Sequence, residues 1–536
     1  MTGGIVQLVA KGKEDLFLTN DPQITFFKVM YRRHTNFARE EICKYFINEP
    51  DFGKRTTCIL DASGDLIDNL SLRLVLPTIN KLSKRGGTDT KFAWVKRIGH
   101  AIIKSIEIEI NGKIIDRHYG EWLHIWNILT THNIDDNGFD KLIGNVAELT
   151  DFTYTKNTYI LYIPLYFWFC RASGLALPIM NLQYCDIKIN LELFELDRCY
   201  IISPTHYIGC YANIVNFEPY EYLTQVTPDG IQRYGLFSHF DMIEKRLYYT
   251  PITANKFIGV PYFGDINNID NVIIETTLNA PNVGKYIIKG TTSDFTVIPY
   301  ILAQTITSHY RTLKNISLNE CLLLVSYVYL DDEERLKFIR TKHDYLIEQL
   351  YYTPNIAIHG TNQKIKLNID NSCKLLIWLA QFDYIYNAND RLNFTDSHIR
   401  KTISDDNHIN NEKIKRYHNI KIGNEVGLSL IEENTIRLNS QERLTKRGND
   451  YFEKIQVIQN SKNILPKGVN MYSFAIFPLD VAPSGTTNMS QIELAEINLR
   501  LNYKVGIEQP AKVRTYAVCY NIWRVDNGLS AVVFVR

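Results

Sequence analysis

Apolar and polar residues alternate along most of the chain, a pattern typical of β-strands with one buried face. The clearest stretch occurs twice. Residues 159–194 and 472–503 each contain an alternating strand, a turn of small residues, a polar stretch and a second alternating strand. Ser173-Gly174 stands in the first stretch where Ser484-Gly485 stands in the second. This internal repetition predicts two β-units of one design.

Other segments extend the β-pattern beyond the two repeats. Further strands are predicted at residues 57–61, 67–76, 322–330 and 513–525 and, as KLLIWLAQF, within 361–386. Asn111-Gly112 predicts a hairpin over residues 102–115, because this dipeptide adopts the tight turn that joins twisted antiparallel strands. Residues 120–129, GEWLHIWNIL, predict a short helix. The chain is therefore expected to be mainly β.

The two repeats differ in how they connect to their last strand. The second repeat uses residues 504–512, whereas the first uses about 195–320. A connection on the order of 120 residues far exceeds an ordinary loop, so we expect an inserted β-rich unit there. Its predicted strands lie at residues 248–249, 259–263, 272–278 and 295–301. A second long loop is predicted at residues 398–450, which are polar and show little periodicity.

Residues 331–350, DDEERLKFIRTKHDYLIEQL, predict the one long helix of the chain. Leu336, Ile339 and His343 recur at steps of three or four residues and give one apolar-leaning face. We interpret this helix as a strut that joins the two β-units. Its acidic start offers carboxylates for a divalent cation, but acids in the first turn already stabilise the helix dipole, and we favour that role.

Composition places the chain among ordinary globular proteins. Hydrophobic residues make up 45% and charged residues 22%. The 59 Lys and Arg balance 58 Asp and Glu, which disfavours a nucleic-acid coat because phosphate binding requires a basic excess. The nine cysteines include no CxxC pair, and we interpret them as free thiols in a reducing compartment. The N-terminus lacks a signal peptide, and we expect a soluble product without direct genome binding.

The motifs of catalytic chemistry are missing from the sequence. No phosphate-binding glycine loop, GxSxG elbow or HExxH zinc motif occurs. His118, Glu121 and His124 are candidate metal ligands, but the tryptophans among them favour packing. The cluster Arg32-Arg33-His34 is a candidate phosphate site, for which a solvated or interface-facing segment is the favoured interpretation. We therefore predict no catalytic residue, no cofactor and no metal site, and a structural role.

Five segments resemble the major capsid proteins of nucleocytoplasmic large DNA viruses. They are residues 3–38, 167–178, 327–350, 470–495 and 513–525. The residues that we take as the structural signature of this resemblance are Pro22, Phe26, Phe27, Tyr31, Arg32, Asn36, Phe37, Pro483, Ser484 and Gly485. The two long connections, 195–320 and 398–450, fall outside the resemblance.

The resemblance implies an all-β fold of two tandem eight-stranded jelly rolls, joined by the helical strut and carrying large loop insertions. The expected divisions are residues 1–24 as an inward-facing N-terminal segment, 25–330 as the first roll with its insert, 331–353 as the helical linker, and 354–536 as the second roll with its polar loop.

The same resemblance implies a capsid protein of the virion, assembled in the host cytoplasm. Its implied partners are two further copies in a trimer, neighbouring capsomers, minor capsid proteins beneath the shell, and an internal membrane that lies nearby but is not spanned. The trimer is implied to have a near-hexagonal outline that tiles an icosahedral lattice. The alternative from another class is a jelly-roll carbohydrate-binding protein or glycoside hydrolase, which would need clustered Trp residues and a pair of carboxylates.

Overall fold

The structure is a computed structural model of the 536-residue chain. It describes all residues except 1–2, 11–18, 20, 30, 32, 81–90, 131–136, 152, 205, 213, 218–220, 228–229, 243–244, 252–255, 260–285, 292, 301–302, 306–315, 359, 388, 397–427, 462, 503–504, 506–509 and 535–536.

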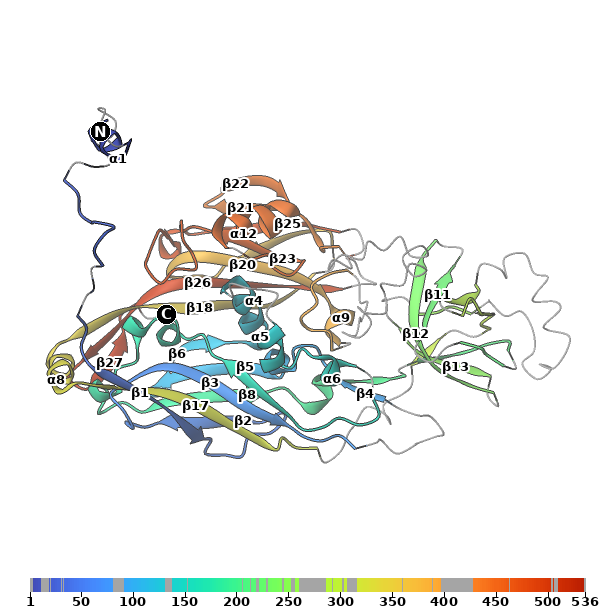
Figure 1. Cartoon of the computed structure of the whole chain (residues 1–536). Coiled ribbons are helices and arrows are strands. Elements are labelled where there is room, and N and C mark those ends of the chain that lie inside the picture. The colour runs from blue at the N-terminus through green and yellow to red at the C-terminus, as the bar shows by residue number, and fades with distance from the viewer. Residues whose placement is uncertain are drawn as a thin grey trace.

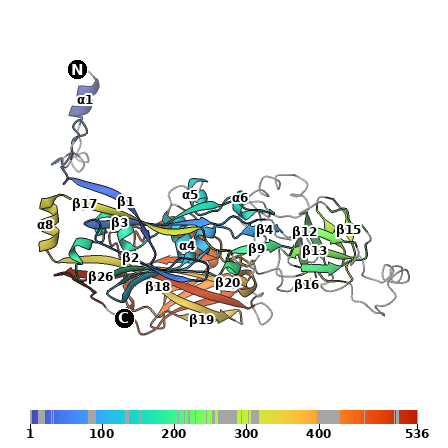
Figure 2. The same ribbon diagram turned by 90° about the horizontal axis from the view of Figure 1, so that it is seen from below.

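Two β-sandwiches lie side by side and form the body of the molecule (Figure 1). A smaller sheet, built from the insert of the first sandwich, extends from one end of this body. The N-terminal segment leaves the body at the opposite end, and both views show it reaching away from the sandwiches (Figures 1 and 2). The long axis of the molecule therefore runs from the N-terminal segment to the inserted sheet.

The first sandwich pairs two four-stranded antiparallel sheets, ordered β1-β17-β3-β7 and β2-β8-β5-β6. Their strands are β1 (Phe37–Tyr45), β2 (Arg55–Leu60), β3 (Leu66–Leu76), β5 (Ile103–Ile110), β6 (Lys113–His118), β7 (Tyr159–Pro164), β8 (Ile187–Leu193) and β17 (Glu320–Leu330). Eight strands in this order make a jelly roll.

The second sandwich repeats the same order with sheets β18-β26-β20-β23 and β19-β25-β21-β22. Its strands are β18 (His343–Ile358), β19 (Asn362–Lys366), β20 (Ser372–Phe382), β21 (Ile431–Leu438), β22 (Gln441–Gly448), β23 (Val469–Ser473), β25 (Ala495–Leu501) and β26 (Ala511–Asp526). Two short strands, β24 (Thr487–Asn488) and β27 (Leu529–Val532), pair with β20 and β26. The predicted double jelly roll and its internal repeat are confirmed, since β7, β8 and β17 correspond to β23, β25 and β26.

Alternating side chains fill each roll. Ile189 and Leu191 of β8 and Leu323 of β17 are buried in the core of the first roll, and Ile497 and Leu499 of β25 in that of the second. The predicted hairpin joins β5 and β6, and its Asn111 and Gly112 have φ of 52° and 74°, as the tight primed turn requires.

Helices and helical turns occupy the connections. They are α1 (Gly3–Val9), α3 (Ile98–Ala101), α4 (Gly120–Thr130), α5 (Asn137–Leu142), α6 (Ala147–Thr150), α8 (Asp332–Arg340), α9 (Asp383–Asn387) and α12 (Gln456–Asn460), with a π-turn at Tyr451–Ile455. Short 3₁₀ turns lie at Trp168–Cys170, Ser173–Leu175, Ile179–Asn181, Leu196–Arg198 and Met489–Gln491. The predicted short helix is α4.

The prediction of a helix over residues 331–350, and of a helical linker to 353, is wrong in length. Helix α8 ends at Arg340, and the strand β18 begins at His343. Tyr345 and Ile347 face the core of the first roll, two residues apart as a strand requires. The step of four residues from His343 to Ile347 is compatible with both periods, and pairing with β26 decides the outcome.

The prediction of a loop across residues 398–450 is also wrong in part. Within the described residues, 431–448 form the hairpin β21–β22 of the second roll. β22 is an edge strand whose residues are mostly exposed and charged. Such polar edges discourage pairing with other chains, and they also hide the alternation that reveals a strand.

The insert forms a separate seven-stranded sheet, ordered β15-β14-β11-β12-β13-β10-β16. Its strands are β10 (His206–Gly209), β11 (Tyr222–Val226), β12 (Gln232–Asp241), β13 (Arg246–Pro251), β14 (Ile288–Gly290), β15 (Thr296–Val297) and β16 (Gln304–Thr305). Strand β9 (Tyr200–Ser203) pairs with β4 (Lys91–Trp94) of the first roll. The strand predicted at 248–249 is β13, and β15 is shorter than its prediction. The strand predicted at 272–278, and all but Gly259 of the one at 259–263, lie outside the described residues.

Candidate assembly surfaces

The N-terminal segment presents large apolar side chains to solvent. Phe26, Phe27 and Tyr31 are 89%, 98% and 84% exposed. Pro22 and Asn36 are exposed as well, and Phe37 starts β1 with about half of its surface exposed. Arg32 lies outside the described residues. Exposed apolar side chains grouped in this way are typical of surfaces that bind protein or lipid.

The second group of signature residues lies in the loop after β23. The Ser484 hydroxyl accepts a hydrogen bond from Phe477 N at 2.8 Å, and the Ser484 carbonyl accepts one from Ile476 N at 3.2 Å. Gly485 has a φ of 133°, which favours glycine. These contacts close the loop and leave Ile476 and Phe477 70% and 61% exposed. Ser484 and Gly485 thus belong to one closed loop, which Pro483 precedes.

A buried charged cluster lies beneath that loop, where the two rolls meet. Glu348 of β18 pairs with both Arg171 of the first roll and Lys374 of β20. Arg171 also donates to the Leu479 carbonyl at 3.1 Å, and Lys374 to the Asp480 carbonyl at 3.4 Å. Burial and the neighbouring Arg171 lower the pKa of the Lys374 amine, and burial lowers the pKa of Arg171 to about 10. One carboxylate therefore holds two cations and fixes the loop to both rolls.

Helix α4 of the first roll packs on the sheet β18-β26-β20-β23 of the second. Trp122 and Trp126 pack on the second roll, and the ring of Trp122 lies 5.6 Å from that of Tyr516. Beside them, Glu121 pairs with Arg514 at 3.0 Å and accepts a hydrogen bond from the Tyr516 hydroxyl at 2.7 Å. Burial raises the pKa of the Glu121 carboxyl, and Arg514 opposes that shift. This part of the junction therefore combines apolar packing with an ion pair.

The candidate metal ligands of this region point to different partners. His118 stacks on Phe167 and pairs with Asp116 at 3.0 Å, whereas Glu121 faces Arg514. His124 Nδ1 accepts a hydrogen bond from Arg97 at 2.9 Å, which requires a neutral ring because a guanidinium can only donate. Across the described residues, no group of three or more His, Cys, Asp and Glu side chains is arranged to hold a metal ion.

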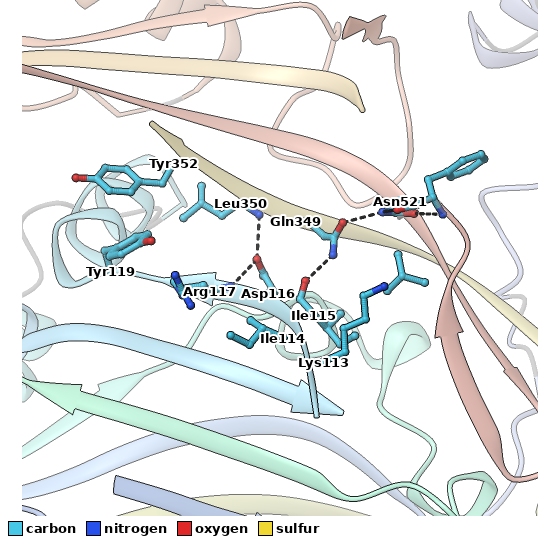
Figure 3. Close-up of a pocket in the computed structure, with 12 residues that line it drawn as sticks. Lys113, Ile114, Ile115, Asp116, Arg117, Tyr119, Gln349, Leu350, Tyr352 and Asn521 are labelled. Carbon is cyan, nitrogen blue, oxygen red and sulfur yellow. Dashed lines mark hydrogen bonds between the residues drawn. The ribbon is translucent and has the colours of Figure 1, made fainter. Parts of the chain in front are cut away.

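A cavity of about 380 Å³, lined by polar and apolar side chains, opens between β6 of the first roll and β18 of the second (Figure 3). Gln349 bridges it, donating to the Ile115 carbonyl and accepting from Asn521 at 2.8 Å. Asp116 accepts a hydrogen bond from Leu350 N at 2.9 Å. The bonds from Gln349 to Ile115 and from Leu350 to Asp116 join the rolls directly, so the cavity belongs to their junction.

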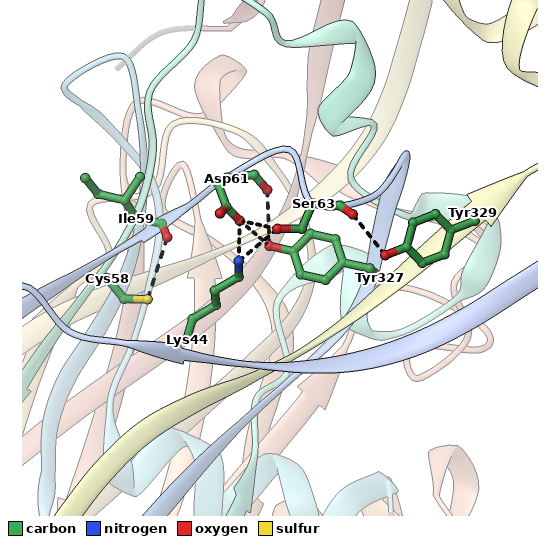
Figure 4. A network of polar contacts seen from close by, with 7 residues as sticks. All are labelled: Lys44, Cys58, Ile59, Asp61, Ser63, Tyr327 and Tyr329. Carbon is green, nitrogen blue, oxygen red and sulfur yellow. Dashed lines mark hydrogen bonds and ion pairs between the residues drawn. The ribbon is translucent and has the colours of Figure 1, made fainter.

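A second polar network ties the edge strand β1 to the first roll (Figure 4). Lys44 pairs with Asp61 at 2.6 Å, and the hydroxyl of Tyr327 donates to the same residue at 3.1 Å. Tyr329 donates to the Ser63 carbonyl at 2.9 Å. These contacts hold the strand that follows the exposed N-terminal segment.

The sequence did not predict the charged cluster around Glu348 or the polar network around Asp61, because the members of each are far apart in the chain. For the cluster around Glu348 the available signal was Lys374, which begins the apolar run KLLIWLAQF, since a buried lysine needs a charged partner. Among the described helices, none has the length and apolar character needed to cross a membrane.

Comparison with known families covers most of the chain. The family model described as the large eukaryotic DNA virus major capsid protein matches residues 334–531, and that of the major capsid protein N-terminus matches 25–226. Probable capsid protein 4 of Acanthamoeba polyphaga mimivirus is 38% identical over 545 residues, covering 100% of this chain and 99% of the relative. The major capsid protein of Phaeocystis pouchetii virus is 29% identical, and 100% of both chains is covered.

Solved structures share the fold. The chain in the quasi-atomic model of the PBCV-1 virus capsid gives a TM-score of 0.59 at 20% identity, over 96% of this chain and 100% of that one. The Faustovirus major capsid protein gives 0.61 at 11% identity, over 96% and 94%. At such identities the likeness concerns the fold alone.

Proposed function

Because the chain belongs to the family of large eukaryotic DNA virus major capsid proteins, we propose that it acts as a homotrimer whose six jelly rolls form one near-hexagonal capsomer. The observation that supports this proposal is the identical strand order of the two rolls. Two equivalent units in each chain allow a threefold ring to imitate a sixfold tile, which can pack against neighbouring capsomers in an icosahedral lattice.

We further propose an orientation for the molecule in the capsid. The N-terminal segment, residues 1–24, and the end of the rolls from which it leaves would face inward, towards minor capsid proteins and an internal membrane. The exposed Phe26 and Phe27 support this direction, because adjacent exposed aromatic side chains are typical of surfaces that bind protein or lipid. The inserted sheet, at the opposite end of the long axis, would form a tower on the outer surface. Assembly in the host cytoplasm suits the nine cysteines, which are all free.

The alternative of a carbohydrate-binding protein or glycoside hydrolase receives less support. A groove of that kind uses exposed aromatic rings, yet all six Trp residues are at most 3% exposed: Trp94, Trp122, Trp126, Trp168, Trp378 and Trp523. The tryptophans of this chain are committed to the cores and to the junction between the rolls.

The proposal is tested by the mass of the purified full chain in solution. Light scattering coupled to gel filtration should give about three times 62.2 kDa, and electron microscopy should show rings with a near-hexagonal outline. A monomer at micromolar concentration that cleaves glycans would instead support the hydrolase.

A further inference from the structure

The packing between the two rolls within one chain has an unoccupied counterpart on the surface. Within the chain, α4 of the first roll covers the outer face of the sheet β18-β26-β20-β23 of the second. Trp122, Trp126 and Leu129 of α4 recur at i, i+4 and i+7, which places them on one helix face. The side chains that they cover include Leu350, Leu375, Ile377, Met471, Tyr516 and Val518.

The second roll has a helix at the equivalent point of its own fold. Helix α4 follows β6, and the helical segment 451–460 follows the corresponding strand β22. Tyr451, Ile455 and Ile458 repeat the i, i+4, i+7 spacing. Trp122 and Trp126 are 3% exposed, whereas Ile455 and Ile458 are 46% and 66% exposed. Ile455 and Ile458 are therefore bare in the second roll, whereas Tyr451 packs against the core of its own roll.

The outer face of the first roll's sheet β1-β17-β3-β7 exposes large side chains on its two edge strands, β1 and β7. Tyr45, Leu322, Arg73 and Tyr162 lie opposite one another in one row across the four strands. Leu323, the next residue of β17, points into the core, so this row faces outward. Tyr45 and Tyr162, on the edge strands, are 72% and 37% exposed, whereas Leu322 between them is 3% exposed. The equivalent row of the second roll includes Tyr516 and Ile377, which α4 covers.

We propose that the segment 451–460 of one copy packs Ile455 and Ile458 on this outer face of a second copy. The contact repeats between chains the contact that α4 makes within each chain. It joins two different surfaces, so it is heterologous and closes into a ring when every step from roll to roll is alike. The inference rests on the proposed trimer and assigns the residues that hold it together. Ile455 and Ile458 on one side, and the exposed Tyr45, Ile160 and Tyr162 on the other, would lose contact with water, which stabilises the ring.

Charge reversal of the apolar contact tests the assignment. The two variants are the double substitution I455D/I458D and, separately, Ile160→Asp on the edge strand β7. We expect each variant to raise the trimer dissociation constant at least about 100-fold, as the loss of central interface anchors does. All three side chains are exposed in the single chain, so the thermal unfolding of the monomer should be unchanged. Ile214→Asp is the matched control, because Ile214 is a 62% exposed isoleucine on the insert.

Cross-linking provides a readout that does not depend on loss of assembly. Cys43 lies on the same outer face, opposite Leu324, and is exposed. A flexible bismaleimide should link I458C to the native Cys43 of another copy and give covalent dimers and trimers, which C43S abolishes. The assigned interface is overturned if the Asp variants remain trimeric and I458C gives no product that depends on Cys43. In that case the proposed trimer stands, provided that the unmodified protein is itself a trimer. An unmodified protein that stays monomeric overturns both.

Discussion

At the scale of single residues, charges buried at the junction of the rolls constrain the molecule most. Glu348 is the one carboxylate that pairs with both Arg171 and Lys374, and the Lys374 side chain is fully buried. We expect Glu348→Gln to lower the free energy of unfolding by about 3–5 kcal/mol, because two buried cations lose their counter-charge. The control is Glu442→Gln, which breaks the exposed pair with Arg437 and should cost at most about 1 kcal/mol. Equal losses in denaturant titrations of the two variants would contradict this account.

Two buried histidines make stability depend on pH. Burial lowers the pKa of His100 to about 3 and lowers that of His124 well below its usual value, and Arg97 adds to both shifts. The unfolded chain binds protons near pH 6.5 that the folded chain does not, so stability is complete above this pH and falls as the pH drops towards the folded pKa values. We expect each histidine to lower the free energy of unfolding by up to about 2 kcal/mol at pH 5. Thermal unfolding between pH 8 and pH 5 measures the loss, and His124→Gln should make the dependence shallower.

At the scale of elements, α4 is held where a side chain at its first residue cannot fit. A Cβ at Gly120 would lie 2.0 Å from the His100 carbonyl oxygen and 2.6 Å from that of Ile103. Gly120→Ala should therefore lower the free energy of unfolding by about 3 kcal/mol, because the new Cβ clashes with these carbonyl oxygens, although alanine has the higher helix propensity. Gly174→Ala, where nothing lies within 4 Å, is the control. Calorimetry that finds Gly120→Ala neutral would show that α4 can shift away from the first roll.

The elements also show how far the sequence determines the fold. Alternation, the repeat and Asn111-Gly112 predicted the buried strands and the hairpin, because burial on one face leaves its period in the sequence. The polar edge strand β22 was missed for lack of that period. The extension of the helix through residues 341–350 was predicted wrongly, because His343 and Ile347 fit both helical and strand spacing and the pairing with β26 is a distant contact. The junction between the rolls was not predictable either, since Glu121 and Tyr516 meet across 395 positions.

At the scale of the whole molecule, the insert and the rolls have separate cores. Phe217, Leu223 and Phe257 are buried in a cluster formed by residues 208–303, whereas the cores of the rolls contain none of that range. Stability of the rolls should therefore not require the inserted sheet. We expect a chain in which a Gly/Ser linker replaces residues 205–315 to keep the thermal transition of the rolls, because long surface insertions cost little beyond loop closure.

The same deletion separates the roles of the two ends of the molecule. If the contact that closes the ring lies between the segment 451–460 and the sheet β1-β17-β3-β7, the shortened chain should still give a trimer by light scattering, with its mass lowered by that of the removed residues. A control deletion of residues 1–24 should also keep the trimer, since neither proposed surface includes them. A shortened chain that folds with its thermal transition intact but runs as a monomer would move the trimer contacts from the rolls to the tower.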